Sequence, residues 1–178
     1  MSVSSYVRMP CSVEEAMARY GRWIGRPEVR PPQLVKERDA IDLALEDDKW
    51  LGIAVYIYPS GSETVIEELS GSSDRSAPEW VALAEGGDLV YASYNDSINF
   101  AELIVVEKGR LVRHILDNED DPSTNVNIGR LPEEAKDPMN DWIDVTGWVE
   151  ADDDKLAHAE QGWLWIHERP ESWSDSPF

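Results

Sequence analysis

Two apolar runs separated by only two residues constrain the fold of this chain more than any other feature. Residues 100–107 and 110–116 both have the composition of strands, and Lys108 and Gly109 lie between them. A two-residue loop containing glycine, which adopts positive φ without strain, is typical of a tight β-hairpin. The sequence therefore predicts an antiparallel pair here, and an antiparallel sheet around it.

Further strands are predicted on both sides of this hairpin. Residues 41–46 alternate apolar and polar side chains, as a strand with one solvent-facing side does. Residues 50–58 are apolar on both faces, which indicates a central strand. The other predicted strands are residues 63–69, 88–94 and 163–168.

Two helices are predicted from capping boxes, in which a Ser and a Glu three residues later satisfy free backbone amides. Ser12 and Glu15 begin the first helix, which ends at Gly25 because glycine favours the left-handed conformation that follows a helix. Ser76 and Glu79 begin the second.

The last third of the chain carries weaker signals. We expect a long loop at about residues 117–141, because this stretch has three prolines and little periodicity. One short helix is expected within it, near 132–136. Residues 142–149 fit either a strand or a short helix, residues 152–161 fit a helix, and residues 170–178 fit a C-terminal tail.

The length and composition indicate one folded domain spanning residues 1–178. A chain of 178 residues buries enough surface to need no disulfide or metal, and eight Trp and six Tyr exclude a disordered composition. The predicted elements place the fold in the α+β class. We expect a mostly antiparallel sheet of about six strands, with helices packed on one face.

The cysteine content and the apolar segments point to a cytoplasmic protein. Cys11 is the single cysteine, so no intramolecular disulfide can form. The first ten residues contain no apolar segment of signal-peptide length. No apolar run, residues 53–57 included, is long enough to span a bilayer.

Charge is strongly acidic and unevenly distributed. The chain has 16 Lys and Arg against 36 Asp and Glu, a formal net charge of −20. Residues 1–38 contain seven basic and four acidic side chains, so the excess of carboxylates lies in the rest of the chain. Such a field repels nucleic acid and anionic membranes and speeds encounter with a basic partner. The alternative is that the charge serves solubility alone.

Motifs for catalysis or metal binding are weak. Asp154 and His158 would share one helical face, a spacing that could hold a metal with an added ligand, but acidic residues in a first turn also complement the helix dipole. Residues 117–121 lack the glycine and the closing Glu of a calcium loop. No phosphate loop, dinucleotide fingerprint or nucleophile elbow is present. We expect no enzyme activity, no metal and no cofactor.

Eight tryptophans exceed what one core of this size usually takes. Trp142, Trp148 and Trp173 lie beside acidic residues in loop-like or terminal settings. An aromatic anchor among carboxylates suits a basic protein partner. The alternative is that these rings only cover irregular loops.

The order of four segments resembles that of small acidic immunity proteins from bacterial polymorphic-toxin and contact-dependent inhibition systems. The segments are Asp-Leu-Val-Tyr-Ala-Ser-Tyr-Asn at 88–95, Lys-Gly-Arg-Leu-Val-Arg at 108–113, Asn-Ile-Gly-Arg-Leu-Pro-Glu-Glu at 127–134 and Asp-Trp-Ile-Asp-Val at 141–145. The resemblance covers roughly residues 50–150 and implies a cytoplasmic inhibitor that occupies the active site or substrate face of a cognate toxin. These families share no catalytic motif, so the resemblance assigns no residue.

The sequence leaves two functional hypotheses. The first is an immunity protein that binds a basic toxin domain, such as a nuclease, and neither nucleic acid nor membrane. Its predicted partner-binding residues are the densest acidic clusters: Asp117, Glu119, Asp120, Asp121, Trp148, Glu150, Asp152, Asp153 and Asp154. The second is a small enzyme or ligand-binding protein whose site is assembled from the distant residues His114, His167, Asp96 and Asn99.

Overall fold

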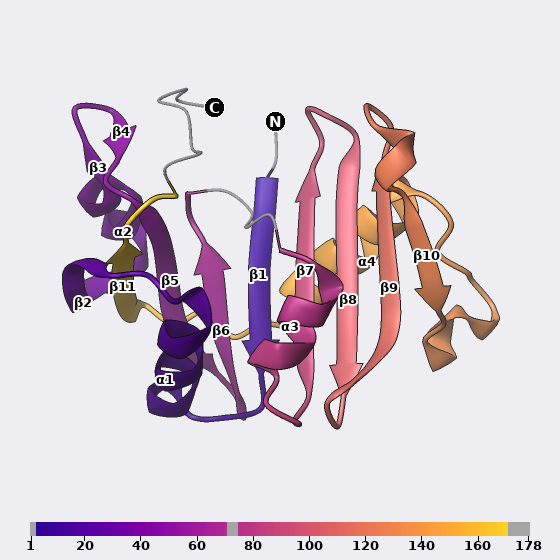
Figure 1. Ribbon diagram of the computed structural model, residues 1–178, viewed down its shortest axis with the longest axis horizontal. Coiled ribbons are helices and arrows are strands. Elements are labelled where there is room, and N and C mark those ends of the chain that lie inside the picture. The colour runs from indigo at the N-terminus through magenta and orange to yellow at the C-terminus, as the bar shows by residue number, and fades with distance from the viewer. Residues whose placement is uncertain (1–2, 71–74, 171–178) are drawn as a thin grey trace.

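A single large antiparallel sheet dominates the computed structural model, which describes residues 3–70 and 75–170 (Figure 1). Within these residues the sheet has nine strands in the order β10-β9-β8-β7-β1-β6-β5-β11-β2. The strands are β1 (Val3–Met9), β2 (Glu28–Lys36), β5 (Ile53–Ser60), β6 (Glu63–Glu68), β7 (Leu89–Asn95), β8 (Phe100–Glu107), β9 (Arg110–Asn118), β10 (Val126–Gly129) and β11 (Gln161–His167). The antiparallel α+β class is confirmed, but the predicted six strands are too few.

Helices cover both faces of the sheet, not one face as the sequence predicted. The helices α1 (Val13–Ile24) and α3 (Ala77–Leu83) pack on one face, and α2 (Glu37–Ala44) and α4 (Trp142–Asp153) pack on the other. Two hydrophobic cores result, because side chains of each strand alternate between the faces. In β5, for example, Val55 and Ile57 join the α1/α3 core, whereas Tyr56 and Tyr58 join the α2/α4 core.

The local signals of the sequence act as predicted. The Glu15 amide donates to the Ser12 hydroxyl at 3.2 Å, and the Ser76 amide donates to the Glu79 carboxylate at 2.8 Å. The capping box of α3 is therefore complete, whereas at α1 only the Ser12 half forms and the Glu15 carboxylate pairs with Arg19 instead. The hairpin of β8 and β9 has positive φ at both turn residues, Lys108 and Gly109 (49° and 71°), as a tight two-residue loop requires.

Three element predictions are wrong or incomplete. The strand predicted at 41–46 is the helix α2, followed by the short pair β3 (Leu45–Glu46) and β4 (Lys49–Trp50). The stretch 142–149, left open between strand and helix, belongs to α4. That helix ends at Asp153, so the helix predicted at 152–161 does not form.

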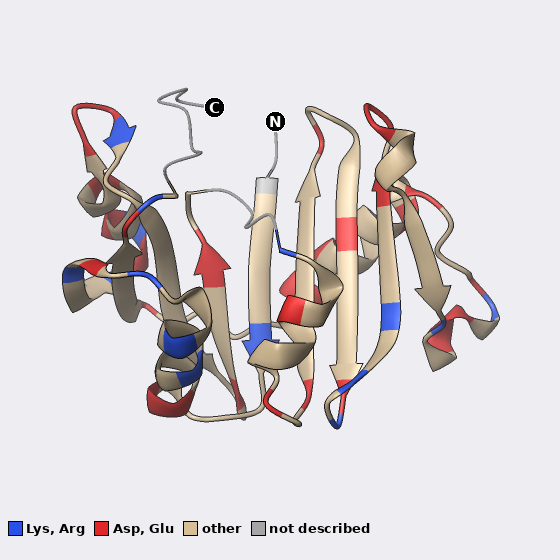
Figure 2. Ribbon diagram, in the orientation of Figure 1, with Lys and Arg blue, Asp and Glu red and all other residues tan. Residues whose placement is uncertain are grey.

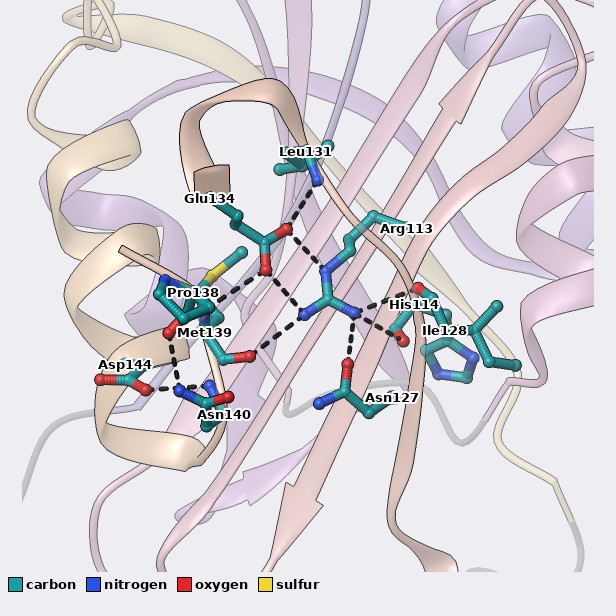
Figure 3. Close-up of polar contacts among 10 residues, drawn as sticks. All are labelled: Arg113, His114, Asn127, Ile128, Leu131, Glu134, Pro138, Met139, Asn140 and Asp144. Atoms are coloured by element: carbon teal, nitrogen blue, oxygen red, sulfur yellow. Dashed lines mark hydrogen bonds and ion pairs between the residues drawn. The ribbon is translucent and has the colours of Figure 1, made fainter. Parts of the chain in front are cut away.

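The long loop predicted at about 117–141 is ordered around a buried arginine. It contains the 3-10 helices η1 (Pro122–Thr124) and η2 (Pro132–Ala135) and, between them, the edge strand β10. Figure 3 shows Arg113 of β9 at the centre, donating to the Asn127 side chain and to the carbonyls of Ile128 and Met139. Glu134 of η2 completes the arrangement as an ion-pair partner.

On the α2/α4 face neither helix packs on the middle of the sheet, where Tyr6 and Val65 are nevertheless buried and Leu156 packs against the same core. The helix α4 packs on β7, β8 and β9, whereas α2 packs on β5, β11 and β2. Strands β1 and β6 lie between these two groups in the sheet. Among the described residues, no helix is long and apolar enough to cross a membrane. The predicted tail beyond Pro170, with Trp173, lies outside the described residues.

Candidate functional site

The first acidic cluster, at the end of β9, is only partly free to meet a partner. Asp117 is half-buried, and its Oδ2 accepts the backbone amide of Trp142 at 2.8 Å, while its Oδ1 accepts the side-chain amide of Asn125. Trp142 is the first residue of α4, whose free amides attract carboxylates. Asp117 therefore fixes the start of α4 and joins the acidic loop to this helix.

The remaining acidic residues of this loop are exposed. Glu119 accepts the side-chain amide of Asn99 at 2.6 Å, and Asp121 caps η1 by accepting the Ser123 amide at 3.3 Å. The Asp120 carboxylate makes no hydrogen bond or ion pair with any residue that the structure describes; only its backbone amide is bonded, to Asn118. Asp120 is thus the carboxylate of this loop that is freest to pair with a partner.

The second cluster lies along α4, which carries no basic residue. Val145, Val149 and Asp152 face the sheet and are buried. The outer stripe is exposed and consists of Ile143, Asp144, Gly147, Glu150, Ala151 and Asp154. Trp148 is half-buried and packs against the core, so it contributes an edge of its ring to the surface.

Asp152 is placed inside the protein, which is a correction to its predicted role at the partner surface. Its side chain is only 9% exposed and pairs with Arg8 of β1, whose Nε lies 2.9 Å from Oδ2. The Tyr6 hydroxyl donates to the same oxygen at 2.8 Å. Burial and then the Asp152 carboxylate raise the pKa of Tyr6. Asp152 holds the C-terminal end of α4 against β1.

Asp153 takes part in a second polar group, which the sequence did not predict. His158 lies beyond the end of α4; its Nε2 is 3.9 Å from Asp153 and its Nδ1 is 3.8 Å from Glu67 of β6. Asp154 and His158 therefore do not share a helical face. The Tyr58 hydroxyl donates to Glu67 at 2.7 Å and lies 3.2 Å from His158 Nδ1.

Electrostatics sets this group apart from an ordinary surface cluster. Burial raises the pKa of Glu67, although the Tyr58 hydrogen bond and His158 act in the opposite direction. Burial also raises the pKa of Tyr58 and of Asp153. Carboxylates perturbed in this way, next to a histidine, are common at functional sites. The available sequence signal was the alternation in β5 that places Tyr56 and Tyr58 on one face.

The four residues of the ligand-binding hypothesis do not come together. His114 of β9 lies on the α1/α3 face with its Nε2 2.9 Å from Glu102, and His167 is buried beside Trp165 in β11. Five strands separate β9 from β11 in the sheet, a span of about 29 Å at 4.8 Å per strand. Asp96 and Asn99 lie in the turn between β7 and β8.

Within residues 3–70 and 75–170, no group of three or more His, Cys, Asp or Glu side chains is arranged to hold a metal ion. The two acidic clusters instead flank a single helix. A helix of 12 residues is about 18 Å long, so the exposed loop carboxylates at its start and Glu150 and Asp154 at its end belong to one continuous surface. We call this surface, with Ile143 and Trp148, the α4 face.

Basic side chains are concentrated elsewhere. Most of those in the first 38 residues lie on α1 and β2, toward the end of the sheet that β2 forms (Figure 2). The α4 helix itself carries Asp144, Glu150, Asp152 and Asp153 and no basic residue, which gives the α4 face a negative potential.

Comparison with known proteins gave no match to a family model, to a curated protein or to a solved structure.

Proposed function

We propose that this protein is an immunity protein, which binds a basic toxin domain through the α4 face and thereby neutralises it. The observation that carries the proposal is the charge of α4 itself. Glu150, Asp153 and Asp154 lie at the C-terminal end of a helix that contains no Lys or Arg. The dipole makes this end negative already, so each carboxylate there disfavours the helix.

A surface that is locally unfavourable in the free protein is typical of a functional site. Only Asp152 is compensated by a basic residue, Arg8; Asp153 lies near His158, while the outer carboxylates Glu150 and Asp154 make no ion pair within the described residues. A cationic partner would relieve the repulsion between them. In the complex these carboxylates would have the basic counter-charges that they lack in the free protein, which favours association with a basic surface.

The residues exposed on the α4 face are also suited to binding a basic protein. Ile143 is 62% exposed, the highest value among the exposed large apolar side chains of the described residues, and the other exposed positions of its helix are acidic or small. Ile143 provides an apolar centre on the exposed stripe, with carboxylates around it, whereas Trp148 lies about 140° around the helix and packs on the core. In interfaces of this pattern, buried apolar side chains contribute most of the affinity, and charged residues at the rim raise the association rate.

The mechanism is steric and electrostatic. The carboxylates of the α4 face would occupy the groove in which a toxin such as a nuclease binds the phosphates of its substrate. No bond is made or broken, and no metal or cofactor is needed. The order of segments 88–95, 108–113, 127–134 and 141–145, which resembles that of small acidic immunity proteins, supports the same proposal.

The test uses the product of a neighbouring gene that encodes a secreted protein with a variable C-terminal domain. Cells that express this domain should survive when the chain is co-expressed, and the two purified proteins should form a complex. Asp120→Lys should slow association several-fold at low salt, because it reverses a rim charge. Glu14→Lys, on α1 and thus on the opposite face, changes the net charge equally and is the matched control. Failure of protection together with failure of binding would end the proposal.

A further inference from the structure

A hollow lies on the same face of the sheet, beside α2, and is separate from the α4 face. It has a volume of about 460 Å³ and lies where α2 meets the part of the sheet that neither helix covers. Its walls include Glu37 and Ile41 of α2, Tyr56 of β5, Glu67 of β6 and Leu69. Tyr56 and Glu67 are directly opposite each other in the β5–β6 register, so both side chains point to this face.

Glu67 presents a carboxylate oxygen to the hollow. Its Oε1 accepts the Tyr58 hydroxyl, whereas its Oε2 has no hydrogen-bond partner among the residues that the structure describes. No Lys or Arg of the described chain pairs with it, and His158 is 3.8 Å away. The side chain is 26% exposed, so a ligand can reach the oxygen while much of the surrounding water is excluded. An ion pair in such a setting is stronger than one on an open surface.

Tyr56 supplies an independent sign of a missing ligand. The residue is 1% exposed, and its hydroxyl is buried without any hydrogen-bond partner within the described residues. Its ring lies over Gly162 of β11, where a Cβ would come within 2.6 Å of the ring carbon Cζ. A buried polar group without a partner is costly, and of the several such atoms in the described residues the Tyr56 hydroxyl is the one whose residue lines the hollow. Burial and then Glu37 and Glu67 raise the pKa of Tyr56 to about 12, so the hydroxyl is protonated at neutral pH.

We propose that this hollow binds a cationic head group carried on an alkyl stem, which is the chemistry of an alkylguanidinium or alkylammonium ion. The head donates to Glu67 Oε2 and to the Tyr56 hydroxyl oxygen, and the stem lies along Ile41 and Leu69. The field of Glu37 and Glu67 favours a cation over a neutral donor. Arg38 also lines the hollow; it is 76% exposed, lies 3.5 Å from Asp39 and makes no ion pair with Glu67 among the described residues.

Two sources share this chemistry. One is a Lys or Arg side chain of the protein partner, an assignment that rests on the function proposed above. The hollow opens on the face that also carries α4, so one partner could reach both. The other source is a free small organic cation. The head-group chemistry is the same in both cases, and the two are separated by experiment.

The first experiment needs no partner protein. The full chain is titrated with n-butylguanidinium chloride and with neutral n-butylurea at constant ionic strength, and backbone amide shifts are followed by nuclear magnetic resonance. Saturable shifts are expected for residues around the hollow with the cation alone. Glu67→Gln should weaken binding about tenfold, since a hydrogen bond to a charged group is lost. Glu14→Gln, which removes an exposed carboxylate on α1, should leave it unchanged. Tyr56→Phe should weaken it several-fold.

Equal shifts with butylurea, or equal binding by the Glu67→Gln protein, would overturn the proposal. The second experiment measures dissociation of the toxin complex for the same variants. Faster dissociation with Glu67→Gln identifies a side chain of the partner as the source. Unchanged dissociation, with butylguanidinium still bound, identifies a free small cation. If no toxin is found, the proposed function fails while the titration still decides whether the hollow is a cation site.

Discussion

Arg113 of β9 and Glu134 of η2 form a two-point ion pair that is almost completely buried. Nε donates to Oε2 at 2.8 Å and Nη2 donates to Oε1 at 2.9 Å, and the two side chains are 1% and 2% exposed. The backbone amides of Leu131 and Met139 donate to the same carboxylate at 2.7 and 3.3 Å. One carboxylate therefore ties the loop between β9 and α4 to the sheet.

Removal of this carboxylate should strongly destabilise the protein. Glu134→Ala leaves the Arg113 guanidinium buried without a counter-charge, which costs about 3 kcal/mol or more in the free energy of unfolding. The neighbouring Glu133→Ala is the control: this side chain is exposed, and its loss should change stability by less than about 0.5 kcal/mol. Urea denaturation measures both. Similar losses from the two variants would contradict this account of the loop.

The same pair predicts a pH dependence. Burial alone would raise the pKa of Glu134, but the hydrogen bonds from the Leu131 amide and from Arg113 outweigh it, so the pKa is lowered from 4.5. A carboxyl with a lowered folded-state pKa stabilises the fold above its unfolded-state pKa, and this contribution is lost as the pH falls through the folded value. The stability difference between the wild type and Glu134→Gln should therefore shrink below pH 4.5. A constant difference across this range would argue against a charged pair.

Charge reversal at the end of α4 should separate stability from binding. Glu150→Lys or Asp154→Lys replaces an anion by a cation at the negative end of the helix dipole, which should stabilise the protein by about 0.5 kcal/mol. The same change should slow association with the toxin. Glu14→Lys, in the first turn of α1, alters the net charge equally but should destabilise and barely affect association. Thermal unfolding and binding kinetics measure the two effects, and a destabilised Glu150→Lys protein would refute the argument from the dipole.

How far the sequence predicts the fold depends on the range of the interactions. The hairpin at Lys108 and Gly109 and the capped starts of α1 and α3 were predicted correctly, because turn and cap geometry involve neighbouring residues. The strand β1 was missed, since its place between β6 and β7 depends on residues more than 50 positions away. The strand β2 was also missed, because two prolines argue against a strand unless it lies at an edge, as β2 does.

The error at α2 has a specific cause. Ile41 and Leu43 alternate with polar residues, which predicted a strand, but both side chains are exposed. The buried residues are Ala40 and Ala44, four positions apart, and this spacing is that of a helix packed on the sheet. Small alanines carry little weight in a hydrophobic pattern. Contact with the large side chains of the sheet therefore decided the conformation.

At the candidate site, the sequence identified the acidic residues but not the contacts that their carboxylates make. Asp117 and Asp152 look like members of acidic clusters, yet one binds the Trp142 amide and the other binds Arg8, which is 144 residues away. Partners this distant in the sequence cannot be inferred from a pattern of neighbouring residues. The exposed Ile143 was missed for the opposite reason, because an isoleucine beside a tryptophan is usually assigned to a core.

The contribution of the apolar centre is best tested at Ile143. Trp148 packs against the core, so Trp148→Ala would weaken both the fold and the complex. Ile143→Ala removes an exposed side chain and should leave the free energy of unfolding within about 0.5 kcal/mol of the wild type. If Ile143 is buried in the complex, its loss should cost about 2 kcal/mol of binding, mostly through faster dissociation. The matched control is Ile98→Ala, an exposed isoleucine in the β7–β8 turn. Equal complex lifetimes for Ile143→Ala and the wild type would remove this residue from the interface.

Glu67 should lower the stability of the free protein at neutral pH. Burial raises its pKa above 4.5, and the carboxylates of Glu37 and Asp153 add to this, while Tyr58 and His158 oppose it. A carboxyl with a raised folded-state pKa binds its proton more tightly in the folded protein, so its ionisation costs stability as the pH rises from 4.5 through the folded value. Glu67→Gln, which still accepts the Tyr58 hydrogen bond, should therefore be more stable than the wild type at about pH 7. The advantage should vanish at about pH 4.

Urea denaturation of both proteins across this pH range provides the measurement, with Glu63→Gln as the comparison. Glu63 is similarly exposed but pairs with Arg8 at 2.8 Å, so its neutralisation should lower stability at neutral pH. A Glu67→Gln protein that is less stable than the wild type at about pH 7 would mean that the carboxylate supports the fold. A gain in stability would instead mean that the fold retains an unfavourable charge facing the hollow, as a residue kept for binding a cation does.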